Sequence, residues 1–140
     1  QAMTIAAKKD RIALQYLINY KDIFDFSVLR YNSLFNRWGD HKWAALSVYV
    51  GLLCQFPDSH IERKYGNQFT PMVTSAMTQV NAVLLKADRP EFLEGMLYQI
   101  DAEFKSSGIN PGTTADMTVA TILAVNLERL ISESVLEFKQ

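Results

Sequence analysis

Two short polar stretches hold the side chains of this sequence that could do chemistry. The first is "PDSHIERKYG", in which Asp58 and Glu62 lie four positions apart and would share one face of a helix. Carboxylate oxygens one turn apart suit Mg²⁺, and the cations Arg63 and Lys64 that follow suit phosphate. The stretch therefore predicts a site for a metal and phosphate. It equally fits a capping box between Ser59 and Glu62, so both interpretations stay open.

The second stretch, "NPGTTAD", begins at Asn110. Gly112 would let the backbone approach an anion, and the free N–H groups of residues 113–115 would point at it from a helix N-terminus. Asp116 would then hold a cation that bridges phosphates. The alternative is an ordinary Pro-Gly turn followed by a capping box between Thr113 and Asp116. The two interpretations use the same backbone physics.

Helices must position these stretches, because apolar residues recur at helical spacing along the chain and no period-2 alternation marks a strand. We predict one all-α domain of six or seven helices, with no internal repeat and no linker. The expected helices span about residues 5–24, 27–38, 41–56, 59–65, 70–87, 90–106 and 113–138.

Capping residues mark most of the expected boundaries. Ser27, Asp40 and Thr70 are predicted N-caps, and Thr70 is followed by a proline that suits a first helical turn. Three helices are expected to end at a glycine, namely Gly39, Gly66 and Gly108.

Two of the expected helices have unusual apolar surfaces. The early part of the last one, "MTVATILAVNL", is apolar on most sides, which predicts a central, buried C-terminal helix. The helix over residues 27–38 carries a dense aromatic and aliphatic face that includes Tyr31, Leu34 and Trp38. That face is either core or a surface that docks a partner chain, because so apolar a patch would be a liability if left exposed.

The composition excludes several classes of protein. A chain of 140 residues that is 49% hydrophobic and 21% charged can bury the core of one domain. Its net charge of −1 argues against nucleic acid as the main partner, and no apolar run reaches the roughly 18–20 residues of a membrane span. The single cysteine, Cys54, cannot form an internal disulfide, so we expect a cytoplasmic setting by default. His41 and His60 lack metal-ligand spacing, and the usual catalytic motifs are absent.

At the two polar stretches the sequence resembles a known family, the triphosphoribosyl-dephospho-CoA synthases. "GINPGTTADMTVATI" is similar to the family's Pro-Gly-[Gly/Thr]-[Ser/Thr]-Ala-Asp signature, and "FPDSHIERKYG" is similar to a stretch upstream of it. "LYQIDAEFKSSGINPG" matches the helix that leads into the signature. The spelling is closer to relatives associated with methanopterin-cofactor synthesis than to the citrate-lyase and malonate-decarboxylase prosthetic-group enzymes.

The resemblance implies an all-α enzyme that uses ATP and Mg²⁺. Dephospho-CoA would attack C1 of the ATP ribose, adenine would leave, and the triphosphate would stay on the transferred ribose. Carried over to this sequence, the likeliest metal carboxylates and catalytic residues are Asp58 and Asp116, with Glu62 as a further metal ligand. Asp101 is a weaker candidate. The residues expected to meet phosphate or nucleotide are Gly112, Thr113, Thr114, Arg63, Lys64 and His60.

The sequence also departs from that family. Members are usually nearly twice this length and carry an N-terminal Lys-Pro-Gly motif, which this sequence lacks. We therefore expect residues 1–3 to be a cloning or cleavage remnant, and residues 4–140 to be one domain equivalent to the C-terminal half of a family member. A missing N-terminal half or a partner subunit would complete the site, the isolated chain would be inactive, and homo-oligomerisation stays open. The alternative is a non-catalytic helical module for dimerisation or partner docking.

Overall fold

The computed structural model describes residues 1–140 and contains helices but no strands. The all-α prediction is confirmed, with eight α-helices rather than six or seven, because the helix expected over residues 5–24 is broken into separate pieces. The elements in order are α1 (Ala2–Ala7), α2 (Arg11–Leu17), the π-helix η1 (Asp22–Ser27), α3 (Val28–Trp38), α4 (His41–Gln55), α5 (Ser59–Tyr65), α6 (Thr70–Lys86), the 3-10 helix η2 (Pro90–Leu93), α7 (Glu94–Ser106) and α8 (Gly112–Phe138).

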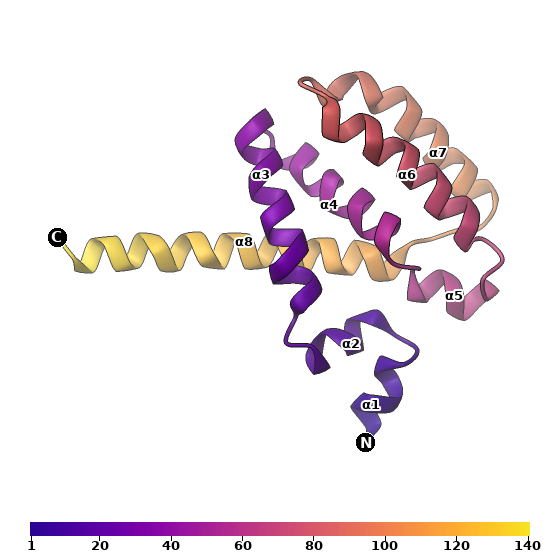
Figure 1. The fold of residues 1–140 in the computed structure, drawn as a ribbon, viewed down its shortest axis with the longest axis horizontal. Coiled ribbons are helices and arrows are strands. Elements are labelled where there is room, and N and C mark those ends of the chain that lie inside the picture. Colours follow the sequence, from indigo (N-terminus) through magenta and orange to yellow (C-terminus); the bar gives the residue numbers. More distant parts are fainter.

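Helix α4 is the centre of the molecule. Figure 1 shows it lying between α3 on one side and the α6–α7 pair on the other. Val50 and Leu53 belong to the larger buried cluster, which α6, η2 and α7 share. Ala44, Val48 and Leu52 belong to a second cluster with η1, α3 and α8. Both clusters form because α4 is apolar around most of its circumference, so it can be buried on two sides.

The prediction of a central, buried C-terminal helix is therefore wrong for most of α8. Its buried residues all lie between Thr113 and Thr121. Ile122, Ala124 and Val125 are still half-buried against the second cluster, but the apolar side chains after them are exposed, with Leu130 at 54% and Ile131 at 63%. Figure 1 shows this end of α8 extending past α3. Helix α8 contacts α4, η1, α3, α5 and α2, but its buried residues end at Thr121, so the apolar run is longer than the surface available to bury it. No helix of the chain is long and apolar enough to cross a membrane.

The aromatic face of α3 is mostly core. Tyr31 and Leu34 are buried, and Phe35 and Trp38 pack against the two clusters while half-buried. Leu29 is the exception, since it is 62% exposed. The core interpretation of this helix is thus confirmed for most of its apolar residues.

The glycine boundaries are confirmed. Gly39, Gly66 and Gly108 follow α3, α5 and α7, and each has a positive φ, between 62° and 69°, that other residues rarely adopt. Asp40 caps α4 as predicted, because its Oδ1 accepts hydrogen bonds from the backbone N–H groups of residues 42 and 43.

The other two predicted N-caps are wrong. Ser27 lies inside a continuous helical run, where η1 passes directly into α3 with helical dihedral angles, so no helix begins there. Thr70 is the first residue of α6 and follows the N-cap Phe69. Pro71 nevertheless occupies the first turn of α6, as its fixed φ favours.

Candidate functional site

Asp58 joins the two polar stretches. Its carboxylate is buried, and Oδ1 accepts hydrogen bonds from the backbone N–H groups of His60 at 2.9 Å and Ile61 at 3.1 Å, which caps α5. Its Oδ2 accepts from the backbone N–H of Thr114 at 2.8 Å and from the Thr114 hydroxyl at 2.7 Å. One carboxylate therefore satisfies donors at the beginning of two helices that are 56 residues apart in sequence. We call Asp58, His60, Thr113 and Thr114 the α5–α8 junction.

His60 closes the junction from the other side. Its backbone N–H also donates to the Thr113 hydroxyl at 3.2 Å. Its ring covers Gly112, where an added Cβ would lie 3.4 Å from the imidazole Cγ. The imidazole therefore packs closely against the beginning of α8, at the edge of ordinary van der Waals contact with a side chain at position 112.

The capping boxes expected from local sequence do not form. Asp58 rather than Ser59 is the N-cap of α5, and the Ser59 hydroxyl instead accepts a hydrogen bond from the backbone N–H of Arg11 at 2.9 Å. Helix α8 has Pro111 at its N-cap position and no cap from its own side chains. The cap that a Thr113–Asp116 box would have supplied comes from Asp58.

The anion at the beginning of α8 is thus a carboxylate of the chain itself. Of the N–H groups expected to face a phosphate, that of Thr114 donates to Asp58 and that of Ala115 donates to the Pro111 carbonyl at 3.0 Å. A helix N-terminus favours negative charge, which explains why a buried Asp58 is tolerated there. The predicted phosphate cradle and the predicted carboxylate have, in this structure, bound to each other.

The three carboxylates predicted to hold Mg²⁺ do not form a cluster. A carboxylate offers about four lone-pair positions, and the four hydrogen bonds of Asp58 use them. Asp116 and Glu62 are exposed and make no ion pair. No group of three or more His, Cys, Asp or Glu residues could hold a metal ion.

The predicted cation Arg63 lines a polar pocket of about 540 Å³ between α1, α2 and α5, which we call the α1–α5 pocket. Only two of its ten lining residues are apolar, and four cations outnumber two carboxylates. Lys64 does not line this pocket and lies over the Tyr65 ring instead. The charged residues of the pocket are Lys8, Lys9, Asp10, Arg11, Glu62 and Arg63.

Two ion pairs organise the α1–α5 pocket. Arg63 Nη1 lies 2.6 Å from Asp10 Oδ2, and Arg11 lies 2.8 Å from Asp22. Partial burial works against ionisation of Asp10, but the hydrogen bonds from Arg63 and from the backbone of α2 outweigh it and lower the pKa of this carboxyl. Lys8 and Lys9 make no ion pair, so their charges are available to a ligand.

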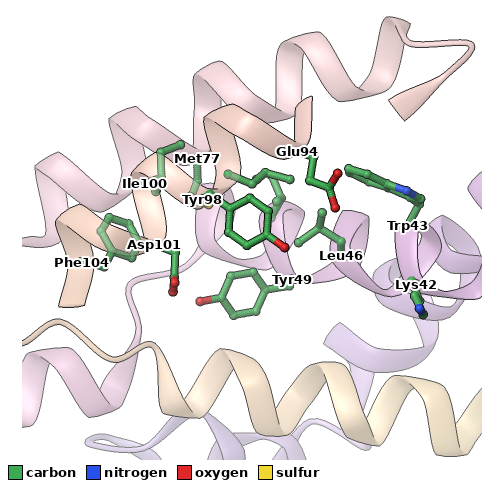
Figure 2. Close-up of a pocket in the computed structure, with 12 residues that line it drawn as sticks. Lys42, Trp43, Leu46, Tyr49, Met77, Glu94, Tyr98, Ile100, Asp101 and Phe104 are labelled. Carbon is green, nitrogen blue, oxygen red and sulfur yellow. The ribbon is translucent and has the colours of Figure 1, made fainter. Parts of the chain in front are cut away.

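A second pocket of about 550 Å³ lies between α4, α6 and α7, and we call it the α4–α7 pocket (Figure 2). Nine of its twelve lining residues are apolar. Asp101, a weaker candidate from the sequence, lies here, whereas the other lining residues were not predicted. No local signal could have found them, since the pocket forms only where α4 meets α7. The lining residues that carry a polar or charged group are Lys42, Trp43, Tyr49, Glu94, Tyr98 and Asp101.

Tyr49 connects the α4–α7 pocket to the junction. Burial raises the pKa of its hydroxyl, and the negative charges of Asp58 and Asp101 raise it further. The hydroxyl is therefore held in its protonated form, in which it can donate a hydrogen bond. The influence of Asp58 on Tyr49 also indicates that this end of the pocket lies near the α5–α8 junction.

Comparison with known proteins gives one result. A family model described as "CitG: ATP:dephospho-CoA triphosphoribosyl transferase" matches residues 1–135. Neither a curated protein nor a solved structure matches the chain.

Proposed function

Since the chain belongs to the CitG family of ATP:dephospho-CoA triphosphoribosyl transferases, we propose that it takes part in transferring a triphosphoribosyl group from ATP to dephospho-CoA or a related acceptor. In that reaction the acceptor loses a proton and bonds to C1 of the ATP ribose. The C1–N bond to adenine breaks, adenine leaves with a proton, and the triphosphate stays on the ribose. The residues Thr113 and Thr114 in the signature support an alternative to dephospho-CoA, namely an acceptor used by the methanopterin-associated branch of the family.

The α5–α8 junction is the observation that carries this proposal. It brings into contact the two stretches that resemble the family's signatures, although they are far apart in sequence. In the proposed site, the cations of the α1–α5 pocket attract the triphosphate, and Pro57 and Ser59 place this pocket beside the junction. Arg63 supplies a planar guanidinium, which suits paired phosphate oxygens, and Lys8 and Lys9 add charge.

The proposal gives Asp58 and Asp116 different roles. Asp58 is a positioning residue, because it would have to give up four hydrogen bonds to bind a metal. Asp116 is the proposed Mg²⁺ ligand, and Glu62 is the second candidate because it lines the α1–α5 pocket. Bound Mg²⁺ would neutralise triphosphate charge as the ribose becomes cationic.

We propose that a further segment or a partner subunit supplies the rest of the catalytic site. The carboxylates of this chain do not assemble a metal site alone, and the Lys-Pro-Gly motif is absent from the sequence. We therefore expect nucleotide binding without turnover from the isolated chain. The alternative, a non-catalytic docking module, is favoured by the exposed apolar side chains of outer α8, such as Leu127 and Ile131.

Calorimetric titration of ATP, with and without Mg²⁺, tests the proposal. Wild-type protein should bind ATP only when Mg²⁺ is present. Asp116→Asn should weaken this binding about tenfold, since it removes one charged contact. Glu133→Gln is the matched control, because it removes an exposed carboxylate from the far part of the same helix, and it should change nothing. Absence of Mg²⁺-dependent nucleotide binding by the wild-type protein would exclude the proposed function.

A further inference from the structure

The α4–α7 pocket has the size and lining of a small-molecule site, and it is separate from the proposed phosphate site in the α1–α5 pocket. Its volume of about 550 Å³ lies within the roughly 300–1,000 Å³ of typical ligand pockets. Its walls include the rings of Trp43, Tyr49 and Tyr98, which come from α4 and α7. Figure 2 shows the two tyrosine rings close together and Trp43 at the other end. Flat aromatic walls of this kind favour a flat ligand.

The charged groups of the pocket are mainly carboxylates, which accept hydrogen bonds. Glu94 makes no ion pair, and Figure 2 shows its carboxylate between Tyr98 and Trp43. Asp101 is partly used, since its Oδ2 lies 2.6 Å from Lys105 Nζ. Lys42 is the only cation among the lining residues, so the two carboxylates leave the pocket with a net charge of −1. This lining disfavours phosphate and suits a flat ligand that donates hydrogen bonds.

We propose that the α4–α7 pocket binds the adenine ring of a nucleotide, with Glu94 accepting a hydrogen bond from the exocyclic amino group. The ring would stack on Tyr98 or Trp43. The protonated Tyr49 hydroxyl would donate to a ring nitrogen. The inference rests on the proposed function, because the family's two substrates, ATP and dephospho-CoA, both carry adenine.

The position of the pocket agrees with this assignment. Helix α4, which forms one wall of the pocket, contacts α8, and the charge of Asp58 at the junction acts on Tyr49. A nucleotide whose base lies between α4 and α7 could therefore direct its ribose and phosphates toward the beginning of α8. The pantetheine arm of dephospho-CoA could also enter an apolar pocket, but it has no flat ring to stack on Trp43 or Tyr98.

Titration of the full chain with adenosine and inosine is the first test. Inosine replaces the amino group with an oxygen, which a carboxylate would repel. Wild-type protein should bind adenosine more tightly than inosine by about tenfold, the effect of one hydrogen bond to a charged group. Glu94→Gln should remove most of this preference, because its amide can donate to the inosine oxygen.

Two further variants keep the test decisive. Glu91→Gln removes an exposed carboxylate from the neighbouring helix η2, outside the pocket, and should leave the preference unchanged. Leu97→Trp should fill the pocket and abolish adenosine binding, while Glu94→Gln changes an exposed residue that folding does not need. Adenosine binding that survives both Leu97→Trp and Glu94→Gln, or that is absent from the wild-type protein, would overturn the assignment. Binding of pantetheine to the pocket in place of adenosine would also overturn the adenine assignment.

Two more titrations show which substrate supplies the adenine, and they distinguish failure of the adenine assignment from failure of the proposed function. Glu94→Gln should weaken the binding of the substrate, ATP or dephospho-CoA, that places its adenine in the pocket. A loss of affinity for either substrate supports the assignment. Tripolyphosphate with Mg²⁺ tests the proposed phosphate site, the α1–α5 pocket beside the α5–α8 junction, without any base. Tripolyphosphate binding without adenosine binding would reject the adenine pocket and leave the proposed function intact, whereas the reverse would reject the phosphate site alone.

Discussion

The two pockets of this molecule have nearly the same volume and opposite chemistry. The α4–α7 pocket is about 550 Å³, mostly apolar and net negative, whereas the α1–α5 pocket is about 540 Å³, mostly polar and net positive. Asp58 is related to both pockets. Its sequence neighbours Pro57 and Ser59 line the α1–α5 pocket, and its negative charge raises the pKa of Tyr49 in the α4–α7 pocket. The difference divides the surface into a part suited to a base and a part suited to phosphates.

The contrast follows from the elements that build each pocket. Helix α4 is apolar on nearly every side, so a hollow beside it is lined by aliphatic and aromatic groups. The α1–α5 pocket is built from short helices that bury little, and charged side chains near residues 8–11 and 62–63 form its surface. A nucleotide has the same two halves, one flat and uncharged and one anionic.

Removing the carboxylate between the pockets should have the largest effect. Asp58→Ala removes the acceptor of four donors at the beginning of α5 and α8, three of them backbone N–H groups, and only the His60 N–H keeps another partner, the Thr113 hydroxyl. We expect a loss of about 3 kcal/mol in unfolding free energy, from two lost helix caps and unpaired buried donors. Urea unfolding followed by circular dichroism measures it.

Thr114→Val is the graded control for that change. It removes only the 2.7 Å hydroxyl contact to Asp58, so it should cost about 1 kcal/mol. If Asp58→Ala were no more destabilising than Thr114→Val, the carboxylate would not be the link between α5 and α8.

The basic pocket is tested by adjacent residues of α5. Arg63→Ala should weaken tripolyphosphate binding about tenfold, because it removes a charged contact from the α1–α5 pocket. Lys64→Ala removes the same net charge outside the pocket and should have little effect. Titrations at two salt concentrations check the electrostatic origin, since added salt should reduce the difference. Equal losses from both variants would indicate non-specific attraction by α5.

A smaller effect is expected in the aromatic pocket. Tyr49→Phe keeps the ring and removes the hydroxyl that is proposed to donate to the base. Adenosine should bind about fivefold more weakly, which corresponds to one neutral hydrogen bond, and tripolyphosphate should bind as before. A loss of tripolyphosphate affinity in this variant would show that the two pockets do not bind the base and the phosphates separately.

The smallest effect concerns the acid stability of the α1–α5 pocket. Because the pKa of Asp10 is lowered in the folded state, its contribution to stability is present above the unfolded value, near pH 4, and is lost as the pH falls further. Asp10→Asn keeps a good N-cap for α2 but not the charge. The gap in unfolding free energy between the two proteins should be below about 1 kcal/mol at neutral pH, since the Arg63 pair is partly exposed. It should shrink toward zero in acid, and a gap that grew in acid would contradict this account.

Local rules predicted much of the fold. Gly39, Asp40 and Gly108 mark real boundaries, because a left-handed glycine or a capping carboxylate acts on its own helix. The caps of α5 and α8 could not be predicted in the same way. Asp58 is adjacent to α5 in sequence, but its contact with Thr114 exists only after the chain has folded.

Other features depended on the tertiary arrangement even more. The burial of α8 was overestimated because an apolar run does not reveal where its neighbours end. The α4–α7 pocket combines Tyr49 and Glu94, which share no motif and meet only through helix packing. The structure brings the two polar stretches into contact, whereas the metal and phosphate roles of their residues stay predictions.

The most direct test of the division is a ¹⁵N–¹H correlation spectrum of the full chain, titrated separately with adenosine and with tripolyphosphate plus Mg²⁺. Adenosine should shift amide signals of α4 and α7 around Trp43 and Glu94. Tripolyphosphate should shift those around Arg63 and Thr113. Two separate sets of shifted residues would support a base pocket and a phosphate pocket on either side of Asp58, and a single shared set would contradict it.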